Sequence, residues 1–347
     1  MTTARWKRRP EGSNWGDFGP DDQLGRMNLL TREVLMKGIA EVKAGRSFCL
    51  SLPLDLPGGT VVNPRRHPPQ LLPTIREGKP NINYPLNRDN PRLLDVSCDD
   101  IVQMSLQYST QWDSFAHVGQ HFDADGDGRA EMVYYNGFRA GEDVIGPIDY
   151  RDGGERPVDA PQGARRLGIE NMAATCVQGR GVMVDLEAHF GRAHRFVGYD
   201  DLMRVLEADK VVIEAGDMVC LRTGLDRIIQ DAKGKPDANI RHVCAGLDGR
   251  DARLLQWITD SGLIVLISDN IAVEASPARA VDDDPCVNLP LHAHCLFKLG
   301  IHLGEMFLLS DLADWLRAAG RNRFLLTAPP LRLPGAVGSP AMPVATV

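Results

Sequence analysis

The segment QYSTQWDSFAHVGQH, residues 107–121, carries the densest group of side chains that could do chemistry. It holds two glutamines, an aspartate and two histidines: Gln107, Gln111, Asp113, His117 and His121. On an extended segment alternate residues share a face, so Gln107, Gln111 and Asp113 could converge on one point. All three offer oxygen ligands, and the histidines offer nitrogen ligands or a general base. The pattern predicts a metal or catalytic site, and a polar turn with hydrogen-bonded amides is the competing interpretation.

A second group lies in LHAHCLFKLGIHLGE, residues 291–305. It holds three histidines and a glutamate: His292, His294, His302 and Glu305. Glu305 directly precedes the apolar run MFLL, so a buried carboxylate there needs a cation or a hydrogen-bond network. A glutamate at a strand end, paired with an arginine or with solvent, explains the pattern equally well.

An acidic loop lies between these groups. Asp123, Asp125, Asp127 and Gly128 imitate the start of a calcium-binding EF-hand loop. The twelfth position is Tyr134 instead of the bidentate glutamate, and no amphipathic helix precedes the loop. A solvated acidic loop is therefore favoured, and a calcium-binding interaction protein is the alternative.

The elements that must position these groups are clearest in the second half of the chain. Hydrophobic patterns predict strands at 181–186, 217–223, 263–268 and 323–327, and helices at 251–260 and from Ser310 to Gly320. Strand, helix and strand in that order imply a right-handed crossover and parallel pairing. Asp269 and Glu274 follow a strand and are interpreted as structural.

The first half of the chain is less regular. Residues 1–30 and 53–97 are rich in Pro, Gly, Asn and Arg, which predicts an irregular N-terminal arm and a long loop. Between them a helix is predicted after the capping residue Thr31, with Leu35, Ile39 and Val42 on one face and Gly45 as its stop. A strand over 46–52 follows. No repeat or linker divides the chain, so one α/β domain spanning residues 1–347 is expected.

Composition excludes several classes of function. The 347 residues carry a formal net charge of −7, which disfavours nucleic acid and anionic membranes as partners. No apolar run approaches the ~20 residues of a membrane span. The seven cysteines are scattered without a CxxC motif, which favours reduced thiols in a cytoplasmic protein. Signatures of nucleotide binding, nucleophile-elbow esterases and zincin proteases are absent.

The segment STQWDSFAH is similar to the second half of H-x-G-T-H-x-D-x-x-x-H, the motif of the cyclase family of metal-dependent hydrolases. That family includes bacterial kynurenine formamidase, isatin hydrolase and trans-dienelactone hydrolase. Further segments resemble the family in the expected order: WGDFGPDDQLGRMNLLT, AGDMVCLRTG, GLIVLISDNIAVE, LHAHCLFKLGIHLGE and GAVGSPAMPVAT. The resemblance covers nearly the whole chain. It implies a swivelling β/β/α fold with a central mixed sheet and flanking helices.

The resemblance also implies roles for single residues. Asp113 matches the motif aspartate that binds metal, and His117 matches the histidine that serves as acid and base. His292 and Glu305 resemble the downstream ligands of the family's metal site.

Gln107 and Gln111 replace the two early histidines of the motif, and a subgroup of longer family members shares this T-Q-x-D form. Glutamine remains a ligand, although its neutral oxygen is a weaker donor than imidazole. We therefore expect a single, oxygen-rich site for one divalent ion, Zn²⁺ or Mn²⁺, with Gln107 and Gln111 among its ligands.

The implied reaction is hydrolysis of an amide, imide or lactone by metal-activated water, with His117 moving the proton. Trp112, Phe115, Tyr135 and His121 are expected to contact a flat or cyclic substrate, and core packing is the alternative for the aromatic residues. The same fold without metal hydrolysis, as a ligand-binding protein or a metal-free lyase or isomerase, is the second functional hypothesis. A small-molecule substrate and a homodimer or homotetramer are the expected partners.

Overall fold

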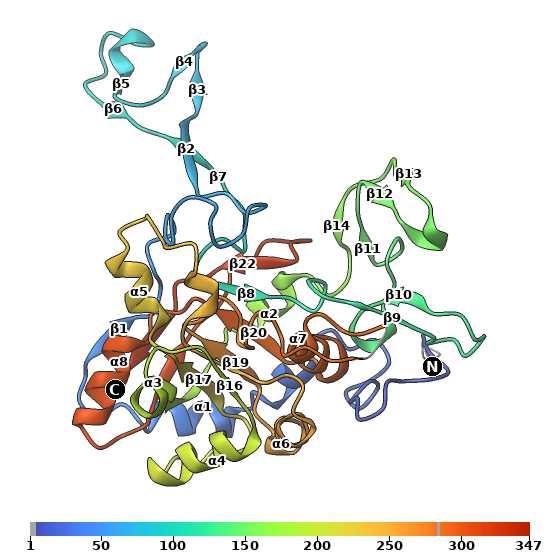
Figure 1. Ribbon diagram of the computed structural model, residues 1–347. Coiled ribbons are helices and arrows are strands. Elements are labelled where there is room, and N and C mark those ends of the chain that lie inside the picture. Colours follow the sequence, from blue (N-terminus) through green and yellow to red (C-terminus); the bar gives the residue numbers. More distant parts are fainter. Residues whose placement is uncertain (1–4, 283–284) are drawn as a thin grey trace.

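The centre of the molecule is a nine-stranded sheet (Figure 1), seen in a computed structural model that describes residues 5–282 and 285–347. In spatial order its strands are β1 (Ser47–Cys49), β23 (Val344–Thr346), β21 (Arg323–Thr327), β15 (Gln178–Asp185), β17 (Met218–Arg222), β19 (Val265–Ser268), β20 (His302–Glu305), β8 (Gln111–Asp113) and β22 (Gly338–Pro340). The four strands from β15 to β20 run parallel, and their neighbours on both sides pair antiparallel. The mixed sheet expected from the sequence is therefore present.

The predicted strand–helix–strand unit forms the middle of this sheet. Helix α6 (Ala252–Ser261) connects β17 to β19, which pair in parallel. The Asp251 side chain accepts hydrogen bonds from the first turn of α6, and Gly262 ends the helix in a left-handed conformation with φ of 69°. The predicted parallel pairing is confirmed.

Helices cover both faces of the sheet because its strands are apolar on both sides. Along β15, Val182 and Val184 enter one core while Met183 enters the other. Helices α4 (Tyr199–Ala208) and α6 pack into the first core, and α8 (Ser310–Ala318) packs into the second. Helix α1 (Arg32–Ile39) lies against β15. The shorter helices are α2 (Ile169–Ala174), α3 (Leu186–Phe190), α5 (Leu225–Asp231) and α7 (Pro290–His292).

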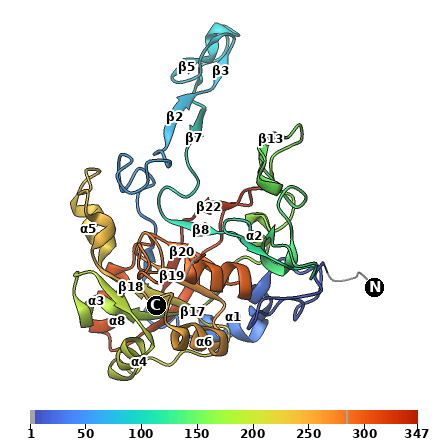
Figure 2. The same cartoon turned by 45° about the vertical axis from the view of Figure 1, so that its right-hand side comes forward.

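Residues 70–103 form a projection that we call the β-arm (Figure 2). Its paired strands are β2 (Gln70–Pro73) with β7 (Asp100–Gln103), β3 (Ile75–Arg76) with β4 (Lys79–Pro80), and β5 (Tyr84–Pro85) with β6 (Val96–Ser97). The sequence predicts a long irregular loop over residues 53–97. In the structure only residues 53–69 of this loop are irregular, because the strands of the β-arm begin at residue 70. Strands this short, some paired across about thirty residues, lack the local periodicity that reveals strands in a sequence.

Four smaller strand pairs complete the described structure: β9 (Gln120–Phe122) with β10 (Glu131–Val133), β11 (Val144–Ile145) with β14 (Gly163–Ala164), β12 (Ile148–Asp149) with β13 (Arg156–Pro157), and β16 (Arg195–Val197) with β18 (Ala245–Leu247). In the described chain no helix has both the length and the apolar character needed to cross a membrane.

The segment before β1 differs in one respect from the expected helix. Thr31 caps α1 as predicted, with its hydroxyl accepting from the Val34 backbone, but the helix ends at Ile39. Val42 therefore lies beyond it, and Ile39 is 43% exposed. In the sequence, the apolar spacing continues beyond Ile39, past the part of the helix that the sheet can cover.

Candidate metal centre

Two neighbouring strands, β8 and β20, bring Gln111, Asp113 and Glu305 together. Their antiparallel register places Gln111 opposite Glu305. Gln111 and Asp113 are two residues apart, so their side chains leave the same face of β8. The Gln111 Nε2 donates a 2.8 Å hydrogen bond to Glu305 Oε2, and all three side chains are buried.

His292 reaches the same place from helix α7. Its Nε2 lies 3.3 Å from Glu305 Oε1 and 3.7 Å from Asp113 Oδ2. On the other side of the ring, Nδ1 lies 2.6 Å from Glu274 Oε1. This hydrogen bond fixes the ring and turns Nε2 towards the two carboxylates, as outer partners of metal-binding histidines do.

The oxygens of this group are short of hydrogen-bond donors. Within the described chain, Gln111 Oε1, both Asp113 oxygens and Glu305 Oε1 are buried without a partner. Each such buried acceptor costs about 1–3 kcal/mol, and more when charged. One ligand atom each from Asp113, His292 and Glu305 lie within 4.8 Å of one another. Two carboxylates and one imidazole nitrogen around a buried point, with the Gln111 amide beside them, fit a divalent cation.

Burial and neighbouring charges shift the protonation equilibria in this group. Burial raises the pKa of the Asp113 carboxyl, and the Glu305 charge raises it further, against the opposite effect of His117 and His292. Burial alone lowers the pKa of His292, but Glu274 and Glu305 raise it to about 10. Without a metal, His292 therefore holds a proton at neutral pH, and a cation at Nε2 has to displace it.

His117 borders the centre on its more accessible side. Its Nε2 lies 3.8 Å from Asp113 Oδ1, and its side chain is 20% exposed. Asp113 itself is completely buried. His117 is thus placed to exchange protons between the centre and solvent.

Gln107 lies in the turn before β8 and not on the strand itself. Its Nε2 lies close to Gly338, whose register partner in β8 is Asp113. This Nε2 is buried without an acceptor. The amide therefore lies beside the centre, with an unpaired donor.

Three aromatic residues expected at the substrate lie in the core. Trp112 enters the face of β8 opposite to Asp113, where its Nε1 donates to the Ala328 carbonyl at 2.8 Å. Phe115 stacks on His302 at 4.0 Å between ring centroids, and Tyr135 lies 5.0 Å from Phe115. All three are fully buried, in agreement with the core-packing alternative.

His121 lies away from the other candidate residues. It belongs to β9 and lines a polar groove of about 960 Å³ together with Asp127, Arg129 and Tyr150. None of the three clustered ligands lines this groove. The structure therefore separates His121 from His117, although only three residues stand between them.

His294 and His302 also lie outside the cluster. His294 Nε2 lies 3.0 Å from Thr259 Oγ1, and His302 Nδ1 donates to the Asp113 backbone carbonyl at 2.8 Å. Burial lowers the pKa of each to about 4, so both rings are neutral at pH 7. His302 supports the pairing of β20 with β8 through its contact with the main chain.

The acidic loop forms the turn between β9 and β10. Asp123, Asp125 and Asp127 bring carboxylate oxygens within 4.8 Å of one another. Asp123 accepts from Arg8 Nη1 at 2.8 Å and from the Gly126 backbone, and the other two accept backbone N–H groups within the turn. Strands, and not helices, flank the loop, so the EF-hand resemblance ends at its first residues.

Two residues near the centre had no functional assignment from the sequence. Glu274 was interpreted as structural, and it holds the His292 ring. Arg66 lies on the irregular loop before the β-arm, and its charge acts on the Asp113 carboxyl, whose pKa it lowers. Arg66 stands in the sequence segment NPRRHPP, but nothing in the composition of that segment predicts that it lies near strand β8, which begins at Gln111.

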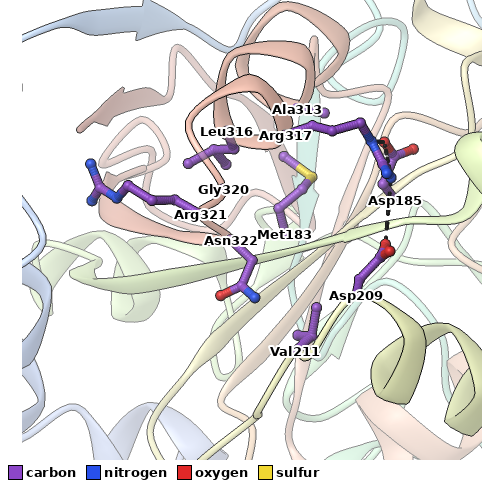
Figure 3. Close-up of a pocket in the computed structure, with 10 residues that line it drawn as sticks. All are labelled: Met183, Asp185, Asp209, Val211, Ala313, Leu316, Arg317, Gly320, Arg321 and Asn322. Atoms are coloured by element: carbon purple, nitrogen blue, oxygen red, sulfur yellow. Dashed lines mark hydrogen bonds and ion pairs between the residues drawn. The ribbon is translucent and has the colours of Figure 1, made fainter.

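A pocket of about 180 Å³ lies apart from this centre, between α8 and β15 (Figure 3). Arg317 crosses it and forms ion pairs with Asp185 at 2.9 Å and Asp209 at 3.4 Å. The charges of Arg317, Asp185 and Asp209 are therefore paired with one another. The cluster around Asp113 is the better candidate.

Comparisons with known proteins identify the family and agree with the fold. The sequence profile of the cyclase family, described as "Putative cyclase", matches residues 50–275. The crystal structure of a novel cyclase is 29% identical, with a TM-score of 0.71 over 96% of this chain and 97% of that chain.

Isatin hydrolases share the fold at lower identity. Isatin hydrolase A from Labrenzia aggregata, bound to benzyl benzoate, is 14% identical with a TM-score of 0.53 over 90% of this chain and 96% of its own. Isatin hydrolase A from Ralstonia solanacearum is 16% identical with a TM-score of 0.53, over 90% and 95%. A comparison with curated proteins finds no match. Because the family profile matches more than half of this chain, the chain belongs to the cyclase family.

Proposed function

We propose that the protein is a metal-dependent hydrolase that cleaves an amide, imide or lactone carbonyl in a cyclic or aromatic substrate. The observation that carries this proposal is the buried group of Asp113, His292 and Glu305 with its unpaired oxygens, in a chain of the cyclase family. The isatin hydrolases that share the fold support this class of reaction.

The proposed cofactor is one divalent ion, Zn²⁺ or Mn²⁺, held by Asp113, His292, Glu305 and Gln111 Oε1. When bound, such an ion polarises a carbonyl and lowers the pKa of a coordinated water. Gln111 and Gln107 are neutral, so the two negative ligands, Asp113 and Glu305, balance the charge of a single divalent ion. This charge balance favours one ion over two.

The protein residues supply orientation and proton transfer. Glu274 holds His292 through the 2.6 Å contact at Nδ1, and Gln111 holds Glu305 through its own hydrogen bond. His117 Nε2 takes the proton of the attacking water and gives it to the leaving nitrogen or oxygen as the C–N or C–O bond breaks. General acid–base catalysis of this kind contributes about 10²–10⁴-fold in rate.

Metal analysis together with a substrate screen tests the proposal. We expect roughly one equivalent of divalent metal in the wild-type protein and in the Asp125→Asn control, and loss of both metal and turnover in Asp113→Asn. The screen uses cyclic amides, aryl formamides and lactones on the metal-loaded protein. Absence of stoichiometric metal, with turnover that resists a chelator, would instead favour a metal-free lyase or isomerase.

We also propose that the protein forms a homodimer or homotetramer through the β-arm. The arm exposes the apolar side chains Leu71 (71%), Ile75 (66%) and Leu94 (96%). Exposed apolar surface on a projection is a common feature of protein interfaces. A second copy of the chain is the proposed occupant.

A further inference from the structure

A narrow pocket opens beside the metal centre, under the irregular loop of residues 53–69. Its polar lining includes Arg66, Gln107, Asn63 and Tyr108, and its apolar lining includes Val62 and Met306. Gln107 lines the pocket, and its Nε2 lies close to Gly338, the register partner of Asp113, so the pocket lies beside the centre. The open space is about 10 Å³, room for about one water molecule or one oxygen atom of a ligand.

Arg66 brings an unpaired positive charge to this pocket. Its Nη1 donates a 2.8 Å hydrogen bond to the Gln107 carbonyl, and no carboxylate in the described chain lies within salt-bridge distance of it. Arg66 is only partly buried, and two buried arginines differ from it in having partners: Arg180 pairs with Asp217 at 2.7 Å, and Arg26 donates to three backbone carbonyls. Arg66 therefore keeps N–H donors for another acceptor.

Gln107 supplies a second unused donor in the same pocket. Its Nε2 is buried and lacks an acceptor in the described chain. An unpaired buried donor costs free energy that a ligand oxygen would recover. Two side chains with spare donors, the Arg66 guanidinium and the Gln107 amide, therefore line one small space.

We propose that Arg66 and Gln107 bind a carboxylate of the substrate, next to the carbonyl that is cleaved. A planar guanidinium matches the two oxygens of a carboxylate, one of which would enter the small space beside Gln107. This inference rests on the proposed hydrolase function and narrows its substrates to carboxylate-bearing amides, imides or lactones.

Two matched pairs of probes test the inference on the metal-loaded protein. The first pair, benzoate and the neutral benzamide, is measured by isothermal titration calorimetry. The second pair, N-formylanthranilate and the neutral formanilide, is measured by kcat/KM. The variants are Arg66→Gln, Arg66→Lys and Gln107→Glu, with Arg65→Gln as the control because this neighbouring arginine is exposed.

We expect the wild-type protein and Arg65→Gln to prefer the anionic member of each pair. Arg66→Gln lowers that preference about tenfold or more, as loss of a charge-assisted bidentate pair predicts, while its metal content stays unchanged. Arg66→Lys keeps part of the preference, and Gln107→Glu reverses it by repulsion.

Any one of three results would overturn the inference. The first is a wild-type protein that shows no preference for the anionic ligand, and the second is a preference that persists in Arg66→Gln because the metal binds the carboxylate. The third is an Arg66→Gln variant that loses its metal and binds both ligands equally poorly. Failure of the hydrolase proposal is distinguishable: both formamides then resist cleavage, while the benzoate preference and its dependence on Arg66 are still measured.

Discussion

Glu274 accepts a 2.6 Å hydrogen bond from the His292 imidazole and also accepts the backbone N–H groups of Leu291 and His292, at 3.1 and 3.0 Å. One carboxylate thus holds both the ring and the start of helix α7. The opposite ring nitrogen is left facing Asp113 and Glu305. Glu274 is therefore a positioning residue for the candidate centre, although it lies 18 residues from His292 along the chain.

Replacing this carboxylate should weaken metal binding without removing a ligand. We expect Glu274→Gln to lower metal affinity about 10–100-fold, the usual effect of losing an outer partner of a metal-binding histidine. A competition titration with a chelating dye measures it, with the exposed Glu142→Gln as control. Unchanged affinity in Glu274→Gln would show that His292 needs no such support.

The two histidines of the 107–121 segment should behave differently. His117→Ala should lower kcat about 10²–10⁴-fold while metal content stays constant, because the proton carrier is lost. His121→Ala is a matched control, since His121 lines the separate groove. Equal losses of kcat in both variants, or no loss in His117→Ala, would reject the assigned role.

Metal affinity should rise with pH. His292 has a pKa of about 10 in the metal-free protein, so a proton competes with the cation below that pH. Apparent affinity should therefore increase by about tenfold per pH unit between pH 7 and 9. Removing the imidazole in His292→Gln should flatten this slope, as measured by dye competition at each pH.

The same shift predicts how the metal-free protein responds to pH. The pKa of His292 is raised from 6.5 in the unfolded chain, so its proton stabilises the folded state fully below about pH 6.5. That stabilisation is lost as the pH rises towards 10. Thermal unfolding of the wild-type protein and His292→Gln across this range should converge at high pH, and parallel curves would contradict the assignment.

Charges placed on the β-arm should separate the subunits. Leu71 and Val102 face one another across β2 and β7 and are 71% and 55% exposed. Light scattering should give two or four copies for the wild-type protein and a monomer for Leu71→Asp with Val102→Asp. Val212→Asp, an equally exposed apolar site outside the arm, is the control. A monomeric wild-type protein would remove the oligomer proposal.

Local patterns predicted the second half of the fold well. Strands β17, β19 and β21 and helices α6 and α8 lie where apolar spacing and terminal glycines place them. Each of these elements is long enough to show its period, and each is buried on a face that the period defines. The β-arm escaped prediction because its strands are two to four residues long.

The candidate centre could be predicted only in part. Alternation placed Gln111 and Asp113 on one face, but no local pattern pairs Gln111 with Glu305, which lies 194 residues further on. That juxtaposition followed from the family resemblance alone. Trp112 and Phe115 were expected to contact the substrate but lie in the core. An aromatic residue next to a reactive residue gives the same sequence pattern in both cases, so the sequence cannot distinguish them.

The place of β8 within the sheet also constrains when the centre can form. Residues 111–113 lie between β20 and β22, which pair with them from residues 302–305 and 338–340. During synthesis both edges of β8 stay without partners until the ribosome has made most of the chain. Closing so long a loop is slow, and such topologies fold late. The candidate centre therefore cannot assemble before the strand that carries Glu305 has been translated.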